Sequence, residues 1–277
     1  MVAFGDTSAR TDTIPQQRGP RSDVTFRLLG QLEILKDDVD HAPTAPKILQ
    51  LVGLLLMSPG RVVHVDSIVE ELWADEPPRS VRTTMQTYVY HLRRCLEHNL
   101  LVDNAEQMLS TRNRGYVLRI HPSQVDVFTF QRLCREGQQL LDAHRHHDAA
   151  RTFRSALDLW SGPPMANINC GPVLSAFAVN LQEQRRHAQH LRIEAEIEDG
   201  AGRGLIGELH SLAAANRLDE VLHGQLIRVL ARSGRRSDAM SVYRDLHGRL
   251  TTELGIEPSD ELQALHMWLL SIGEPSR

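Results

Sequence analysis

Residues 80–96 are predicted to form a helix whose two faces differ in chemistry. At about 100° per residue, the apolar side chains that gather on one face are Val81, Met85, Tyr88, Val89, Leu92 and Leu96. The opposite face carries Thr83, Gln86, Thr87, Tyr90 and Arg94, with Arg93 beside them. This polar face holds hydrogen-bonding and cationic groups but no Asp or Glu. Such a helix fits the major groove of DNA, where an arginine can donate to both acceptors of guanine.

The segment around this helix is basic in a chain that is acidic as a whole. Residues 77–120 contain seven arginines and three acids, a net charge of +4, whereas the whole chain has −4. A phosphate backbone attracts such a patch through the release of counterions. Arg112 and Arg114 flank the tip of a predicted hairpin, where they could reach phosphate or the minor groove. The residues therefore favour a DNA-binding surface, although composition alone leaves open a plain amphipathic helix followed by a basic turn.

The rest of the sequence contains no pattern that indicates catalysis. With 277 residues, 41% of them hydrophobic and 24% charged, the chain has the composition of a soluble protein of about two domains. It contains no Gly-Lys dipeptide, no His-Glu-x-x-His and no Gly-x-Ser-x-Gly, so three common catalytic or nucleotide-binding motifs are missing. The three cysteines, Cys95, Cys134 and Cys170, lie far apart in the sequence. This spacing suits a protein of the reducing cytosol and indicates neither a disulfide framework nor a zinc site. We expect no enzyme activity, no metal site and no cofactor; the cluster His144, His146 and His147 is interpreted as an interhelical turn.

The first 120 residues are predicted to form a compact unit after a disordered tail at residues 1–22. Alternating apolar residues predict strands from Val24 to about Pro43, with a hairpin turn at Asp37-Asp38. Helices are expected at 47–57, at 67–73 after an N-terminal cap by Asp66, and from a cap at Ser80 to about Glu97. A final hairpin is expected across residues 108–118. Strands, three helices and a hairpin indicate a mixed α/β domain at 23–120.

Beyond His121-Pro122 only helical patterns occur, which predicts an all-α second domain at 121–272 and a tail at 273–277. The predicted helices cover residues 126–142, 146–160, 173–199, 204–215, 218–232, 235–253 and 259–271. Asp148-Ala149 followed by Phe153-Arg154 is echoed by Asp238-Ala239 followed by Tyr243-Arg244. Such an echo indicates a tetratricopeptide-like stack of helix pairs. The longest apolar run, residues 48–57, is about half a membrane span, so we expect a cytoplasmic protein without membrane contact.

Several motifs, in order, resemble those of a known family. In the first domain these are Phe26-Arg27-Leu28-Leu29-Gly30, Glu71-Leu72-Trp73, Pro77-Pro78-Arg79-Ser80-Val81-Arg82, Tyr88-Val89-Tyr90-His91-Leu92-Arg93-Arg94 and Asn113-Arg114-Gly115-Tyr116-Val117-Leu118. In the second they are Asp126-Val127-Phe128, Leu157-Asp158-Leu159-Trp160-Ser161-Gly162-Pro163 and Glu253-Leu254-Gly255-Ile256-Glu257-Pro258-Ser259. The chain resembles the Streptomyces antibiotic regulatory protein family of transcriptional activators. The resemblance implies an OmpR-type winged helix-turn-helix domain followed by a bacterial transcriptional activator domain. The chain departs from the pattern at Gln50, where a basic residue is frequent.

The resemblance also implies a mechanism. Such proteins activate secondary-metabolite (antibiotic) clusters: they bind direct repeats in double-stranded DNA as head-to-tail dimers and recruit RNA polymerase through its σ factor and other subunits. Carried over by position, Arg94, Thr83, Thr87 and Tyr90 are expected at base edges or nearby phosphates. Arg93, Arg79, Ser80 and Arg82 are expected to hold the DNA backbone, and Arg112 and Arg114 to serve the wing. The location implied is cytoplasmic and nucleoid-associated. An alternative from another class is a helical-repeat adaptor whose first domain docks protein rather than DNA.

Overall fold

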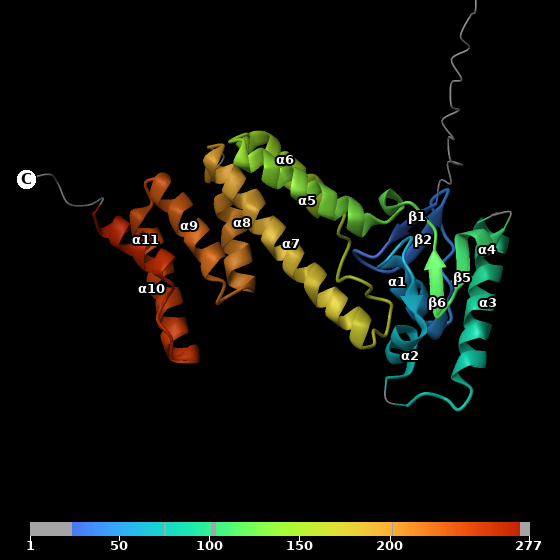
Figure 1. Cartoon of the computed structure of the whole chain (residues 1–277). Coiled ribbons are helices and arrows are strands. Elements are labelled where there is room, and N and C mark those ends of the chain that lie inside the picture. Colours follow the sequence, from blue (N-terminus) through green and yellow to red (C-terminus); the bar gives the residue numbers. More distant parts are fainter. Residues whose placement is uncertain (1–23, 75, 101–103, 201, 272–277) are drawn as a thin grey trace, which may run out of the picture.

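The computed structural model describes residues 24–74, 76–100, 104–200 and 202–271 (Figure 1). The tails expected at 1–22 and 273–277 lie outside these residues. The chain folds as a winged helix-turn-helix unit of mixed α/β structure followed by a helical unit, which confirms the predicted fold class. Within the described part of the chain, no helix is long and apolar enough to cross a membrane.

The described part of the chain begins with a small antiparallel sheet of three strands. Its strands are β1 (Thr25–Arg27), β2 (Glu33–Lys36) and β3 (Val39–Asp40), in the order β1-β2-β3. Phe26 pairs with Ile34, and both side chains are buried, because alternate residues of a strand face the same side. Asp37 and Asp38 have φ values of 51° and 60°, which is the left-handed pair that a two-residue hairpin turn requires. The turn predicted there is confirmed.

Three helices follow the sheet: α1 (Pro46–Leu56), α2 (Val65–Trp73) and α3 (Val81–Leu100). Four of the six residues in the predicted apolar stripe of α3 are buried: Met85, Val89, Leu92 and Leu96 are 2–3% exposed. The other two, Val81 and Tyr88, are half-buried. Helix α2 begins before Asp66, with His64 at its N-cap and no capping side chain, so the cap predicted at Asp66 is wrong. Asp66 instead lies in the first turn, where an acid still interacts favourably with the helix dipole.

The wing is the hairpin of β5 (Leu109–Arg112) and β6 (Gly115–Leu118), preceded by the short helix α4 (Ala105–Met108). A third strand, β4 (Val63–His64), pairs with β6 and gives the sheet order β4-β6-β5. Gly115 permits this pairing, because a Cβ there would lie 2.3 Å from the carbonyl oxygen of Val63. The sequence analysis did not predict strand β4, since two residues are too few to show an alternating pattern.

The helical unit follows a 3₁₀ turn at Pro122–Gln124. Its helices are α5 (Asp126–Asp142), α6 (His146–Leu157), α7 (Pro172–Glu198), α8 (Gly202–Ala215), α9 (Glu220–Arg232), α10 (Arg236–Arg249) and α11 (Asp260–Ser271). Each predicted helical segment is present, and α10 continues into a π-helical turn at Leu250–Leu254 that ends at left-handed Gly255. In Figure 1 these helices form an elongated array beside the winged helix.

The predicted echo corresponds to two helix pairs, α5 with α6 and α9 with α10. Equivalent residues are His144 and Gly234, Arg145 and Arg235, Asp148 and Asp238, Ala149 and Ala239, and Phe153 and Tyr243. The first residues, His144 and Gly234, have positive φ in both turns. In both, the arginine pairs with the aspartate three residues later, at 2.5 and 2.7 Å. The alanines are 0% exposed, so the small side chain lets the second helix approach its partner closely.

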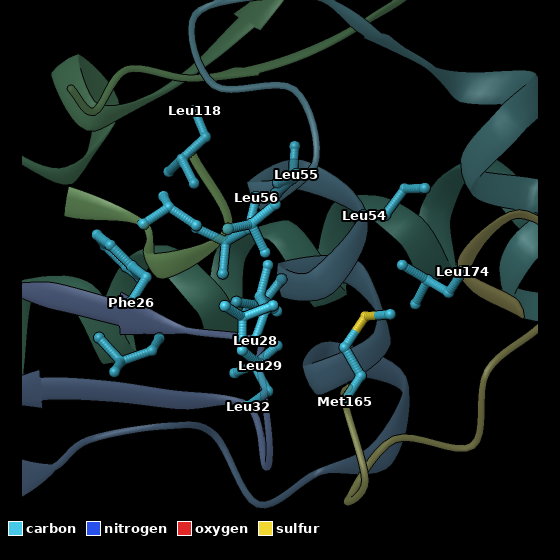
Figure 2. Packing of buried hydrophobic residues seen from close by; sticks show 14 of the residues in the cluster. Phe26, Leu28, Leu29, Leu32, Leu54, Leu55, Leu56, Leu118, Met165 and Leu174 are labelled. Atoms are coloured by element: carbon cyan, nitrogen blue, oxygen red, sulfur yellow. The ribbon is translucent and has the colours of Figure 1, made fainter. Parts of the chain in front are cut away.

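The main hydrophobic core does not stop at the domain boundary. One cluster of buried side chains runs from Val24 to Ala195 and unites the winged helix with α5, α6 and most of α7. Figure 2 shows Met165 and Leu174, from the helical unit, packed in the cluster that contains Leu28, Leu32 and Leu54. A second cluster, from Ile193 to Leu269, holds the remaining helices together.

Hydrogen bonds reinforce this junction at the β1–β2 turn. The carboxylate of Asp126 accepts hydrogen bonds from the backbone N–H groups of Leu28 (2.9 Å) and Leu29 (3.0 Å). The side chain of Asn167 accepts from the N–H of Leu32 at 2.7 Å and donates to its carbonyl at 3.0 Å. Burial raises the pKa of Asp126, and the backbone N–H groups, which favour its ionised form, offset part of that rise. The turn of the first sheet is therefore completed by residues of the helical unit.

Candidate nucleic-acid interface

The outer face of α3 is free of acids and open to solvent. The predicted site residues that are exposed are Arg79, Ser80, Arg82, Thr83, Gln86, Thr87, Tyr90, Arg94, Arg112 and Arg114. Tyr90 is 59% exposed, which is high for an aromatic side chain and means that it does not contribute to the core. Thr83, Thr87, Tyr90 and Arg94 succeed one another at spacings of four, three and four residues, so they form one stripe along the helix.

A groove of about 460 Å³ separates the first half of α3 from the wing. Arg82 and Gln86 line it from the helix, and Arg112 and Arg114 line it from the hairpin. The structure thus brings these four predicted residues together, whereas the stripe from Thr83 to Arg94 lies outside the groove. Two basic prongs on either side of a groove can follow a DNA backbone while the helix occupies the major groove.

Seven further residues line this groove that the sequence analysis did not select as site residues, among them the polar Thr111, Asn113 and Asp66. Asn113 and Arg114 form the two-residue tip of the hairpin, and Arg114 has a φ of 68°. The sequence could have indicated Asn113 as a site residue, because it stands between two arginines and its amide can donate to phosphate and accept from base edges. Asp66 comes from the first turn of α2, a contact that only the folded chain creates.

The hydroxyl of Thr87 is partly committed within α3. Its Oγ1 donates to the carbonyl oxygen of Thr83 at 3.0 Å. In this rotamer the side chain presents a methyl group and an oxygen that can only accept. Such a surface suits a thymine methyl or a base amino group.

Arg93 differs from the other predicted residues. Its side chain is 19% exposed, and its Nε and one terminal nitrogen donate to the carbonyl oxygen of Leu109 at 3.0 and 2.8 Å. The same nitrogen donates to Thr111 Oγ1 at 2.9 Å, and Glu106 lies 3.7 Å from the other terminal nitrogen. Arg93 therefore fastens α3 to the wing from within the protein, a role that the sequence analysis did not foresee.

Gln50, the departure from the family pattern, is buried at the back of the helix-turn-helix. It is 4% exposed, and its Nε2 donates to the backbone carbonyl and to the carboxylate of Glu71 at 3.2 and 3.3 Å. A buried side chain in this position lies away from solvent and serves packing between α1 and α2.

The interhelical turn expected for the histidine cluster holds only His144, because His146 and His147 form the start of α6. His147 Nδ1 lies 2.9 Å from a carboxylate oxygen of Asp199, and the rings of His144 and His146 are 6.0 Å apart. Across the described ranges, no group of three or more His, Cys, Asp or Glu side chains could hold a metal ion. Burial raises the pKa of Cys134 to about 11, so this thiol stays protonated near neutral pH.

In comparisons with known proteins, each of the two units of the chain matches a protein-family model. A family model described as "Bacterial transcriptional activator domain" matches residues 125–270, and one described as "Transcriptional regulatory protein, C terminal" matches residues 41–118. The regulatory protein DnrI of Streptomyces peucetius is 35% identical over 248 residues, which cover 88% of this chain and 91% of DnrI. The transcriptional regulator RedD of Streptomyces coelicolor is 31% identical over 90% of this chain and 71% of its own length.

The same arrangement exists in a solved structure. Mycobacterium tuberculosis EmbR, in complex with a low-affinity phosphopeptide, matches with a TM-score of 0.86 and 30% sequence identity. The match covers 92% of this chain and 66% of the EmbR chain. With both domain models matched in order and DnrI covered almost end to end, this chain belongs to the Streptomyces antibiotic regulatory protein family, transcriptional regulators in which an OmpR-type winged helix precedes a bacterial transcriptional activator domain.

Proposed function

We propose that this chain is a sequence-specific DNA-binding activator of transcription for a cluster of secondary-metabolite genes. The observation that carries the proposal is the acid-free, exposed face of α3 beside a basic wing. In this proposal α3 lies in the major groove, with Arg94, Thr83, Gln86, Thr87 and Tyr90 toward base edges. Arg79, Ser80 and Arg82 contact phosphates near the start of the helix, and Arg112 and Arg114 contact them from the wing. The chain has no catalytic role and needs no cofactor.

Residues 23–120 bind the DNA in this proposal, and residues 121–272 mediate assembly and activation. Two protomers lie head to tail on direct repeats about one helical turn apart, so that both contact one face of the duplex. The helical unit then recruits RNA polymerase through its σ factor and other subunits. Membership of a family of transcriptional regulators supports this assignment, as do the relatives DnrI and RedD.

Selection from a random pool of DNA duplexes tests the proposal directly. The purified chain should enrich a direct repeat, and footprinting should protect two half-sites on one face, about one turn apart. Transcription with purified RNA polymerase holoenzyme, from a promoter that carries the enriched repeat, should rise when the chain is added. Binding that resists salt, or a pool without enrichment, would point instead to an adaptor whose first domain docks protein, because phosphate contacts weaken steeply with salt.

A further inference from the structure

A carboxylate of the winged helix caps a helix of the activator unit. Glu71, on α2, is 2% exposed, and its side chain accepts hydrogen bonds from three backbone N–H groups at the start of α7. The donors are Gly171 at 2.6 Å, Val173 at 2.9 Å and Leu174 at 2.9 Å. The first N–H groups of a helix have no partner within it and form its positive end, so a carboxylate is the group that best satisfies them.

The backbones of the two helices also meet at this point. A Cβ at Gly171 would lie 2.2 Å from the carbonyl oxygen of Glu71, although the φ of Gly171 is an ordinary −81°. Glycine is therefore needed here for close approach and not for an unusual backbone conformation. Lys47 Nζ donates to the carbonyl of the next residue, Leu72, so α1 also contacts this turn of α2.

Helix α2 passes this constraint to α3. The rings of Trp73 and Tyr88 are stacked, with centroids 6.1 Å apart and planes inclined by 17°. Tyr88 follows Thr87 directly on α3, and its neighbour Val89 is 2% exposed in the core. A displacement of α2 therefore changes the packing behind the face of α3 that is proposed to read DNA.

We propose that Glu71 is a positioning residue for DNA binding: through it, helix α7 of the activator unit fixes the orientation of α3. This inference rests on the proposed function. Glu71 lies on the buried side of α2 and does not line the groove between α3 and the wing. Its effect on DNA binding therefore passes through α2 and the stacked rings of Trp73 and Tyr88. Coupling of this kind is reciprocal: DNA that binds better to the fixed orientation also strengthens the contact between Glu71 and α7.

Asp126 offers a matched control for a purely structural role. It is also a largely buried carboxylate that joins the two units, and it also accepts from backbone N–H groups, those of Leu28 and Leu29. Its contacts hold the β1–β2 turn and do not involve α2. The substitutions Glu71→Gln and Asp126→Asn remove the same charge from the same junction while keeping the size of the side chain.

The experiment measures binding of each variant to two duplexes at a temperature where circular dichroism shows both variants folded. One duplex is the sequence that the wild-type chain enriches most from a random pool, and the other is a scrambled duplex of equal composition. We expect Glu71→Gln to weaken binding to the selected duplex about tenfold. Binding to the scrambled duplex and the salt slope should stay close to wild type, because the arginines still contact phosphate. Asp126→Asn should lower the melting temperature but retain the preference for the selected duplex.

A second measurement needs no variant. In the wild-type chain, the selected duplex should slow hydrogen exchange of the amides of Gly171, Val173 and Leu174, which lie about 100 residues after Glu71 in sequence. Exchange that the duplex leaves unchanged overturns the coupling, as does wild-type preference in Glu71→Gln. If Asp126→Asn loses the preference for the selected duplex to the same extent as Glu71→Gln, the proposal is also overturned. Any weakening of the junction between the two units would then be enough to reduce the preference. A wild-type chain that enriches no duplex contradicts the proposed function itself.

Discussion

The guanidinium of Arg93 donates two hydrogen bonds to the carbonyl oxygen of Leu109, at 3.0 and 2.8 Å, across the space between α3 and the first strand of the wing. Leu109 is 0% exposed, so its carbonyl lies where few other donors can reach it. Arg94, the next residue, points to solvent. Two adjacent arginines thus have different tasks: one fixes the distance between helix and wing, and the other remains available for a ligand.

Replacement of Arg93 by alanine is expected to lower the free energy of unfolding by about 2 kcal/mol, because a buried carbonyl loses a charged donor. Arg93→Lys should restore less than half of this, since an ammonium cannot reproduce the two-pronged contact. Urea denaturation measures both values. Arg132→Ala, which removes an exposed pair with Glu136, is the control and should cost less than about 1 kcal/mol. If Arg93→Ala is as stable as this control, the contact with Leu109 contributes nothing.

Arg94→Ala is expected to weaken binding to the selected duplex by about 1–3 kcal/mol, as the loss of an arginine contact to guanine does. Its stability should stay near wild type, because the side chain is exposed on α3. Fluorescence anisotropy with the selected duplex and with single-base variants gives the size of the loss and the base that is read. Unchanged affinity would mean that a different face of α3 enters the groove.

Arg112→Ala is expected to weaken binding to every duplex by a similar factor. A wing residue that contacts phosphate adds affinity without sequence preference, so its removal should also reduce the salt slope by about one. Titrations at several salt concentrations, with selected and scrambled duplexes, give both quantities. A loss confined to the selected duplex would instead indicate that Arg112 reads a base.

A fragment ending at residue 120 is expected not to unfold cooperatively. It lacks Asp126 and Asn167, whose side chains bind the β1–β2 turn, and it lacks Met165 and Leu174 from the shared core. A fragment that extends to residue 198 keeps the whole first cluster and should show a single sharp thermal transition. Circular dichroism of the two fragments decides the matter, and a cooperative transition in the shorter one contradicts the expectation.

His223 is expected to make the chain less stable in mild acid. Burial lowers the pKa of this imidazole below 6.5, and the nearby charge of Arg249 adds to the effect. Between its folded pKa and 6.5 the unfolded chain binds more protons, so stability falls as the pH falls through this window, by at most about 1.4 kcal/mol per pH unit. Urea denaturation at pH 7.5 and 5.5 gives the free energy of unfolding at each pH. The difference between the two values should be smaller in His223→Gln than in wild type. The exposed His187 supplies the control substitution, and an equal difference in both variants would refute the role of His223.

Long elements were predictable because their pattern repeats. The bounds of α5 were predicted at residues 126 and 142, where they lie, since seventeen residues give several turns of apolar spacing. The exposed stripe of α3 was predictable for the same reason. Strand β4 was not, because Val63 and His64 become a strand only when Gly115 lies opposite them.

The contacts that join the two units could not be predicted from the local sequence pattern. Glu71 follows Glu70 on a short helix, and nothing in the sequence tells the buried acid from the exposed one. Its partners lie about 100 residues later in the chain, at the start of α7. The internal contact of Arg93 was not predictable for a similar reason: next to Arg94 it looks like one more cation, and only the folded hairpin supplies the carbonyl to which it donates.

The hydrogen bonds between residues 28–32 and the segment 161–167 set where such chains can be recombined. Ser161, Met165 and Ala166 donate backbone hydrogen bonds to the carbonyls of Leu29, Leu28 and Gly30, in that order. An exchange of DNA specificity between relatives that cuts at residue 120 would give each of these acceptors a foreign donor. A graft that carries residues 24–198 as one block keeps every pair intact, so the interchangeable module of this protein is larger than its winged helix.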